Sequence, residues 1–67
     1  MTQEEIIQEL FKARVTNRMS QTDLGVVAGY NRSQVARTEL GQITPRLGMV
    51  CDIADALGLE IVVRPKE

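Results

Sequence analysis

Polar and basic side chains gather in one stretch near the middle of the chain, AGYNRSQVARTELG at residues 28–41. An arginine held in a DNA groove can donate two parallel hydrogen bonds to the O6 and N7 atoms of guanine. The stretch therefore fits either a helix that reads nucleic acid or a solvated helix face beside a glycine turn. The candidate reading residues are Asn31, Arg32, Ser33, Gln34 and Arg37.

Charge is unevenly distributed along the chain. The formal net charge is −1, but the segment 12–46 carries +4, while the segments 1–11 and 47–67 carry −3 and −2. DNA binding depends on a local basic face that displaces counterions from phosphates, and not on the total charge. The weakly negative total therefore does not exclude a nucleic-acid partner.

The residue types leave little room for catalysis or metal binding. The chain has one cysteine, Cys51, and no histidine, which excludes intrachain disulfides, the usual zinc sites and Cys–His or Ser–His catalysis. We expect no enzyme activity, no metal, no cofactor and no small-molecule ligand. No apolar run approaches the roughly 20 residues of a membrane span, and no signal peptide is visible. A cytoplasmic protein with no membrane partner is expected.

A chain of 67 residues forms one small domain with a limited core. Such a chain buries only about 60% of its unfolded surface, so a lone copy is marginally stable and oligomerisation is expected. Hydrophobic residues make up 43% of the chain, and Phe11 and Tyr30 are the only aromatic ones. The composition therefore predicts an aliphatic core of packed helices.

Local signals predict where four helices begin and end. Capping boxes, in which an N-cap residue and the residue three positions later bond each other's backbone, predict three starts. Thr44 followed by Pro45 predicts the fourth, and Gly29, Gly41 and Gly58 predict helix ends. The expected helices span residues 2–17, 20–27, 31–40 and 44–57. The capping boxes are Thr2 with Glu5, Ser20 with Asp23, and Asn31 with Gln34.

The segment after the fourth helix has a different character. Residues 59–64, LEIVVR, are rich in β-branched side chains and precede Pro65, which predicts one short strand. A single strand cannot satisfy its own backbone groups, so we expect it to pair with the same strand of a second chain across a two-fold axis. The expected dimerisation residues are Leu59, Ile61, Val62 and Val63.

The two short helices over 20–27 and 31–40 are joined by a glycine turn, which is the arrangement of a helix-turn-helix unit over residues 20–40. Leu24, Ala28 and Val35 are expected to point inward, and the small Gly25 lets the two helices approach closely. On the fourth helix, the expected core-facing stripe is Leu47, Val50, Cys51, Ala54 and Leu57.

The segment SQTDLGVVAGYNRSQVARTELG resembles the helix-turn-helix of the Xre family, which includes the phage repressors and Cro proteins. The following ITPRLGMVCDIADALG resembles the next helix of that family, so the resemblance covers residues 10–58. It implies an all-α, repressor-like DNA-binding domain of four to five helices, here with one short C-terminal strand. The chain departs from the family pattern at Gly25, Tyr30 and Thr38. The matching positions are Ser20, Gln21, Leu24, Gly29, Ser33, Glu39 and Gly41.

The resemblance implies roles for individual residues. Gln21, at the start of the second helix, matches a residue that contacts phosphate. Arg14 and Glu39 match a structural ion pair that ties the first helix to the end of the third. The positions that face base edges or adjacent phosphate are Arg32, Ser33 and Arg37, with Asn31 and Gln34 beside them. The positions that follow the sugar–phosphate backbone after the third helix are Gln42, Thr44 and Arg46.

These features predict a single helix-turn-helix DNA-binding domain over residues 1–67. The expected function is a sequence-specific regulator of transcription, a homodimer that represses by occupying a near-palindromic operator on double-stranded DNA. The LGLEIVV segment is similar to antitoxin-type members of the family, which bind a toxin protein and repress their own operon. The alternative is a protein-interaction module that neutralises or scaffolds a partner without DNA. The resemblance implies a bacterial or phage protein associated with the nucleoid.

Overall fold

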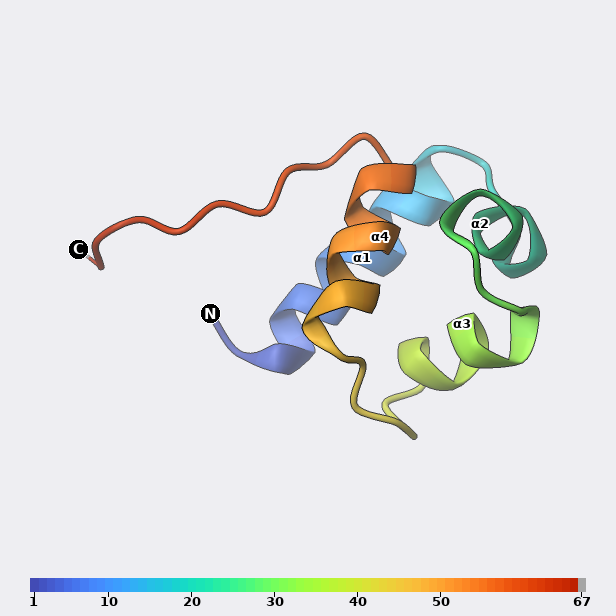
Figure 1. The fold of residues 1–67 in the computed structure, drawn as a ribbon, viewed down its shortest axis with the longest axis horizontal. Helices are drawn as coiled ribbons and strands as arrows, with labels where there is room; N and C mark the ends of the chain where they lie inside the picture. The colour runs from blue at the N-terminus through green and yellow to red at the C-terminus, as the bar shows by residue number, and fades with distance from the viewer. Residues whose placement is uncertain (67) are drawn as a thin grey trace.

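Four α-helices and an extended C-terminal tail make up the chain in the computed structural model, which describes residues 1–66. The helices are α1 (Gln3–Thr16), α2 (Gln21–Ala28), α3 (Arg32–Glu39) and α4 (Leu47–Ala56). α2 packs against both α3 and α4, and α1 packs against α3. Figure 1 shows how the four helices are arranged. The prediction of a helical fold is confirmed. Over the described residues, the structure shows no helix with the length and apolar character needed to cross a membrane.

Local side-chain bonds determine where α1, α2 and α3 begin. In each helix the N-cap side chain accepts a hydrogen bond from the backbone N–H three residues later, and the side chain of that later residue accepts one from the N-cap N–H. Both distances are 2.9 Å between Ser20 and Asp23. These bonds satisfy backbone donors that have no partner inside the helix. All three predicted capping boxes are confirmed.

The start of α4 differs from the prediction. The helix begins at Leu47 with Arg46 as its N-cap, and no side chain caps it. Thr44 and Pro45 lie before the helix, so their prediction as N-cap and first helical residue is wrong. Arg46 has the extended backbone of an N-cap, with φ of −68° and ψ of 154°, so the cap lies two residues later than Thr44. Tertiary context commonly overrides such local signals.

The predicted apolar stripe of α4 is confirmed at Ala54 and Leu57, which are buried, and is wrong at two other positions. Leu47 is 73% exposed and Cys51 is exposed, so the prediction that they are buried is wrong. Residues 49, 53 and 57 recur every four positions and therefore share one face of the helix. The buried residues of α4 and of the turn that follows it are Met49, Ile53, Ala54 and Leu57.

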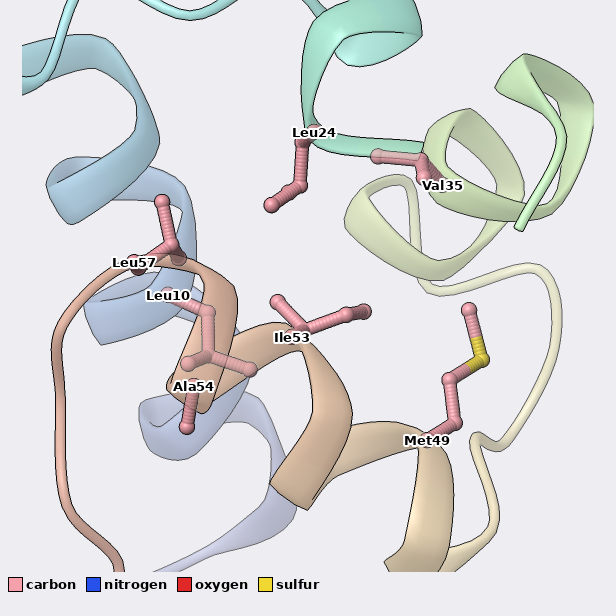
Figure 2. Close-up of a cluster of buried hydrophobic side chains, with 7 residues drawn as sticks. All are labelled: Leu10, Leu24, Val35, Met49, Ile53, Ala54 and Leu57. Carbon is pink, nitrogen blue, oxygen red and sulfur yellow. The ribbon is translucent and has the colours of Figure 1, made fainter. Parts of the chain in front are cut away.

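One apolar cluster joins the four helices. Leu24 of α2 and Val35 of α3 are each only 1% exposed, which confirms that both point inward. Figure 2 shows them converging with Leu10 of α1 and Ile53 of α4. Burying a side chain of this size contributes roughly 1.5–3 kcal/mol. The cluster therefore holds α3 by one side and leaves its other side outward.

All four helices end in a similar way. A residue with positive φ follows the helix, and the next backbone N–H donates to the carbonyl five positions earlier. Three of these residues are the predicted stops Gly29, Gly41 and Gly58, with φ of 89°, 74° and 72°, but the fourth is Arg18, with φ of 56°. A Cβ in this region costs on the order of 1 kcal/mol, which glycine avoids. The closing bonds run from Met19 to Arg14, Tyr30 to Gly25, Gln42 to Arg37 and Leu59 to Ala54.

The tail after α4 is extended and leaves the helical body (Figure 1). Residues 59–66 form no strand in the described structure. Their apolar side chains are exposed, up to 99% for Val63. An open groove of about 960 Å³ lies between the tail, α1 and α4. The predicted strand and its pairing across a dimer stay predictions.

Candidate nucleic-acid interface

α3 has one buried and one exposed side. Val35 and Thr38 are buried, whereas Arg32, Ser33 and Arg37 are exposed. Ser33 and Arg37 are four positions apart and share a helix face, and Arg32 is the first residue of the helix. The structure thus leaves Arg32, Ser33 and Arg37, the three residues predicted to face base edges or phosphate, exposed on one helix.

Asn31 and Gln34 bond each other at the start of α3. The Gln34 N–H donates to Asn31 Oδ1 at 2.8 Å, and the Asn31 N–H donates to Gln34 Oε1 at 2.9 Å. Each side chain uses its oxygen for the cap and keeps its NH₂ group. The backbone carbonyl of Gln34 also accepts from the buried Thr38 hydroxyl at 2.8 Å. Asn31 and Gln34 therefore fix the start of α3 while their amide donors remain at the surface.

An ion pair joins α1 to the end of α3. Arg14 Nε donates to Glu39 Oε2 at 2.6 Å, and Arg14 Nη2 donates to Glu39 Oε1 at 3.0 Å. Both side chains are only 12% exposed. The remaining Arg14 nitrogen, Nη1, donates to the Met19 carbonyl at 2.8 Å, and the guanidinium lies 5.1 Å from the centroid of the Phe11 ring. Two parallel bonds from a planar guanidinium fix direction as well as distance, so α3 is held firmly against α1.

The chain matches known proteins over nearly its whole length. Residues 8–66 match the family described as a helix-turn-helix domain. The chain belongs to this family. Over 64 residues it is 42% identical to an uncharacterized HTH-type transcriptional regulator, y4dL, of Sinorhizobium fredii. That match covers 96% of this chain and 33% of the relative, so the chain spans about a third of the relative's length. No solved structure matches the chain significantly.

Gln21 begins the first helix of the helix-turn-helix and is bonded to the ion pair. Its Nε2 donates to Glu39 Oε1 at 2.9 Å, so α1, α2 and α3 meet at one carboxylate. The bond uses one of the two Nε2 hydrogens and leaves the other for an outside acceptor. The sequence does not predict this bond, because nothing in the spacing of two residues 18 positions apart indicates a contact.

Tyr30 connects the turn of the helix-turn-helix to α4. Its hydroxyl donates to Asp52 Oδ2 at 2.7 Å, and its ring packs against the core cluster. The bond to the Asp52 carboxylate raises the pKa of Tyr30, because only the neutral phenol can donate. This contact positions the residue that directly precedes the Asn31 cap, and the sequence carried no signal for it.

The loop between α3 and α4 holds the residues predicted to follow the sugar–phosphate backbone of DNA. Gln42, Thr44 and Arg46 are all exposed. Among residues 1–66, the ion pairs are Arg14 with Glu39 and Lys12 with Glu9. The basic groups of α3 and of this loop therefore have no carboxylate partner in the described structure. Residues 1–66 include no cluster of side chains suited to hold a metal ion.

Proposed function

We propose that this domain binds double-stranded DNA by placing α3 in the major groove and thereby regulates transcription. The observation that carries the proposal is the exposure of Arg32, Ser33 and Arg37 on a helix that Val35 fixes in the core. The major groove admits an α-helix, and a bidentate arginine–guanine contact is worth roughly 1–3 kcal/mol of discrimination. Membership of the helix-turn-helix family and a relative named as a transcriptional regulator support the proposal.

Contacts to the sugar–phosphate backbone would hold α3 in register on the duplex. We assign them to Gln21 at the start of α2, where the helix dipole also favours an anion. The side-chain NH₂ groups of Asn31 and Gln34 remain as further donors near the exposed residues of α3. The assigned contacts of the loop after α3 are Gln42, Thr44 and Arg46.

Repression by a homodimer is the proposed mode of action. Two copies of α3 would occupy successive major grooves about 34 Å apart on a near-palindromic operator and would occlude the promoter. The tail supports the dimer, because residues 59–64 expose apolar side chains and an extended backbone that a second copy of the strand could pair. The resemblance of the LGLEIVV segment to antitoxin-type members of the Xre family supports a second candidate, an autoregulating antitoxin that also binds a toxin protein.

Titration of labelled duplexes tests the proposal. One duplex carries the region upstream of the gene and the other an unrelated sequence, and both are titrated by fluorescence anisotropy between about 50 and 200 mM salt. We expect preferential binding to the upstream duplex, with log K falling linearly as log[salt] rises.

Arg37→Ala should remove roughly 1–3 kcal/mol of the preference and leave the thermal midpoint nearly unchanged. Lys12→Ala is the matched control, since it removes one exposed positive charge from α1. Binding that is absent at every salt concentration, or independent of salt, would instead favour a protein-interaction module that works without DNA.

A further inference from the structure

Arg18 has an unusual backbone conformation for its residue type. Its φ of 56° lies in the left-handed region, and among residues 1–66 every other residue with positive φ is a glycine. Gly29, Gly41 and Gly58 occupy the corresponding place after the other three helices. Glycine enters this region without the steric penalty of a Cβ. The arginine is therefore a less stable choice than glycine at this position.

Interactions within the chain do not offset this penalty. The Arg18 side chain is exposed, and its guanidinium forms no ion pair among the described residues. The Arg18 N–H donates to the Val15 carbonyl at 3.0 Å, a bond that a glycine would form equally well. Residues held in sparsely populated backbone regions cluster at active sites, ligand clamps and switch regions.

Arg18 lies in a firmly held loop that leads into α2. On the C-terminal side of Arg18, Arg14 Nη1 donates to the Met19 carbonyl at 2.8 Å. Further along, Gln21 Nε2 donates to Glu39 Oε1 at 2.9 Å. These bonds connect the loop to α1 and to the end of α3. The guanidinium of Arg18 is therefore presented from a rigid support three residues before Gln21, the proposed phosphate contact.

We infer that Arg18 is a further phosphate-binding residue of the DNA interface and contacts the strand that Gln21 contacts. The inference rests on the proposed function. A guanidinium binds phosphate through charge-assisted, forked hydrogen bonds, and such a contact does not depend on base sequence. Arg18 would therefore raise affinity for any duplex, whereas the face of α3 selects the sequence.

Three substitutions at this position separate strain from binding. Arg18→Gly removes both the strain and the charge. Arg18→Asn removes the charge and places a residue that tolerates the left-handed region better than most. Arg18→Lys is the matched control that keeps the charge. Each is measured in the full chain by thermal unfolding and by anisotropy with the upstream and unrelated duplexes.

We expect Arg18→Gly to raise the thermal midpoint by several degrees and to weaken binding to both duplexes by a similar factor. Removing one phosphate-binding charge should make the slope of log K against log[salt] shallower by about 0.9, which corresponds to a decrease in affinity of roughly eightfold at 0.1 M salt. Arg18→Asn should show the same decrease in affinity, and Arg18→Lys should retain most of the slope.

Two results overturn the inference while leaving the proposed function intact. One is an unchanged affinity and salt slope for Arg18→Gly when the unsubstituted chain binds DNA. The other is a loss of affinity confined to the upstream duplex, because a phosphate contact cannot distinguish the two sequences. If the unsubstituted chain binds neither duplex, the proposed function and this inference both fail.

Discussion

The backbone of Tyr30 lies directly against Gly25. The Tyr30 N–H donates to the Gly25 carbonyl at 2.8 Å, and the Tyr30 carbonyl oxygen occupies the space that a Cβ on Gly25 would need. Because Tyr30 precedes the Asn31 cap, any side chain at residue 25 would displace the start of α3.

Gly25→Ala should therefore destabilise the fold, by about 1–3 kcal/mol as expected for overpacking. Gly48→Ala is a matched control in α4, where an added Cβ meets no atom within 4 Å. It should stabilise by about 0.4–1 kcal/mol, because alanine loses less backbone entropy on folding. Urea unfolding gives the change in the free energy of unfolding for each variant. A Gly25→Ala variant as stable as the unsubstituted chain would show that the backbones of Gly25 and Tyr30 are not in close contact.

Breaking the Arg14–Glu39 pair should be strongly destabilising. Removing either partner leaves a largely buried charge uncompensated, at a cost of roughly 3–5 kcal/mol, a large part of the stability of a small domain. We expect the costs of Arg14→Met and Glu39→Gln in the free energy of unfolding to sum to more than the cost of the double variant.

The exposed pair of Lys12 and Glu9 provides the control for this double-mutant cycle. Its atoms are 3.7 Å apart, and its side chains are 69% and 59% exposed. Lys12→Ala should change the free energy of unfolding by less than about 0.5 kcal/mol. Costs of equal size for the two pairs would mean that the Arg14–Glu39 pair is solvated.

The capping boxes predict a loss of stability in acid. The Ser20 backbone N–H lowers the pKa of Asp23, and the Thr2 backbone N–H lowers the pKa of Glu5. Both folded-state pKa values lie below the ordinary values of 3.8 and 4.5. The stabilisation is therefore present above those ordinary values and is lost as the pH falls through the lowered ones. Asp23→Asn should flatten the dependence of the urea midpoint on pH between about 5 and 2.

Shortening the tail should change the oligomeric state. Removing residues 61–67 keeps Leu59, whose N–H closes α4 on the Ala54 carbonyl at 2.8 Å, so the helical body should remain folded. If the proposed strands pair across a dimer, sedimentation should show monomers for this variant and dimers for the full chain. Arg64→Ala, which keeps the apolar tail, is the control. A shortened chain that still dimerises would place the interface elsewhere.

Features that depend on a few neighbouring residues were predictable from the sequence. The capping boxes and the glycine stops are of this kind, because every atom they need lies within about one helical turn. The start of α4 was not, since Thr44 gives a valid local signal but the N-cap is Arg46, and tertiary context overrides such signals. The buried face of α4 was predicted only in part, because Leu47 and Cys51 are exposed. The Tyr30–Asp52 and Gln21–Glu39 bonds join residues 22 and 18 positions apart, and only the folded chain brings them together.

The similar endings of the four helices have a consequence for how the chain folds. Each helix is closed by bonds between residues at most five positions apart, and three also begin with a reciprocal pair. Such bonds close small loops at little entropic cost, and chains rich in local contacts fold in microseconds to milliseconds. Pairing of the proposed strand is a bimolecular step, so its rate depends on protein concentration. At low concentration, folding of the helical body would therefore be complete before the two copies meet.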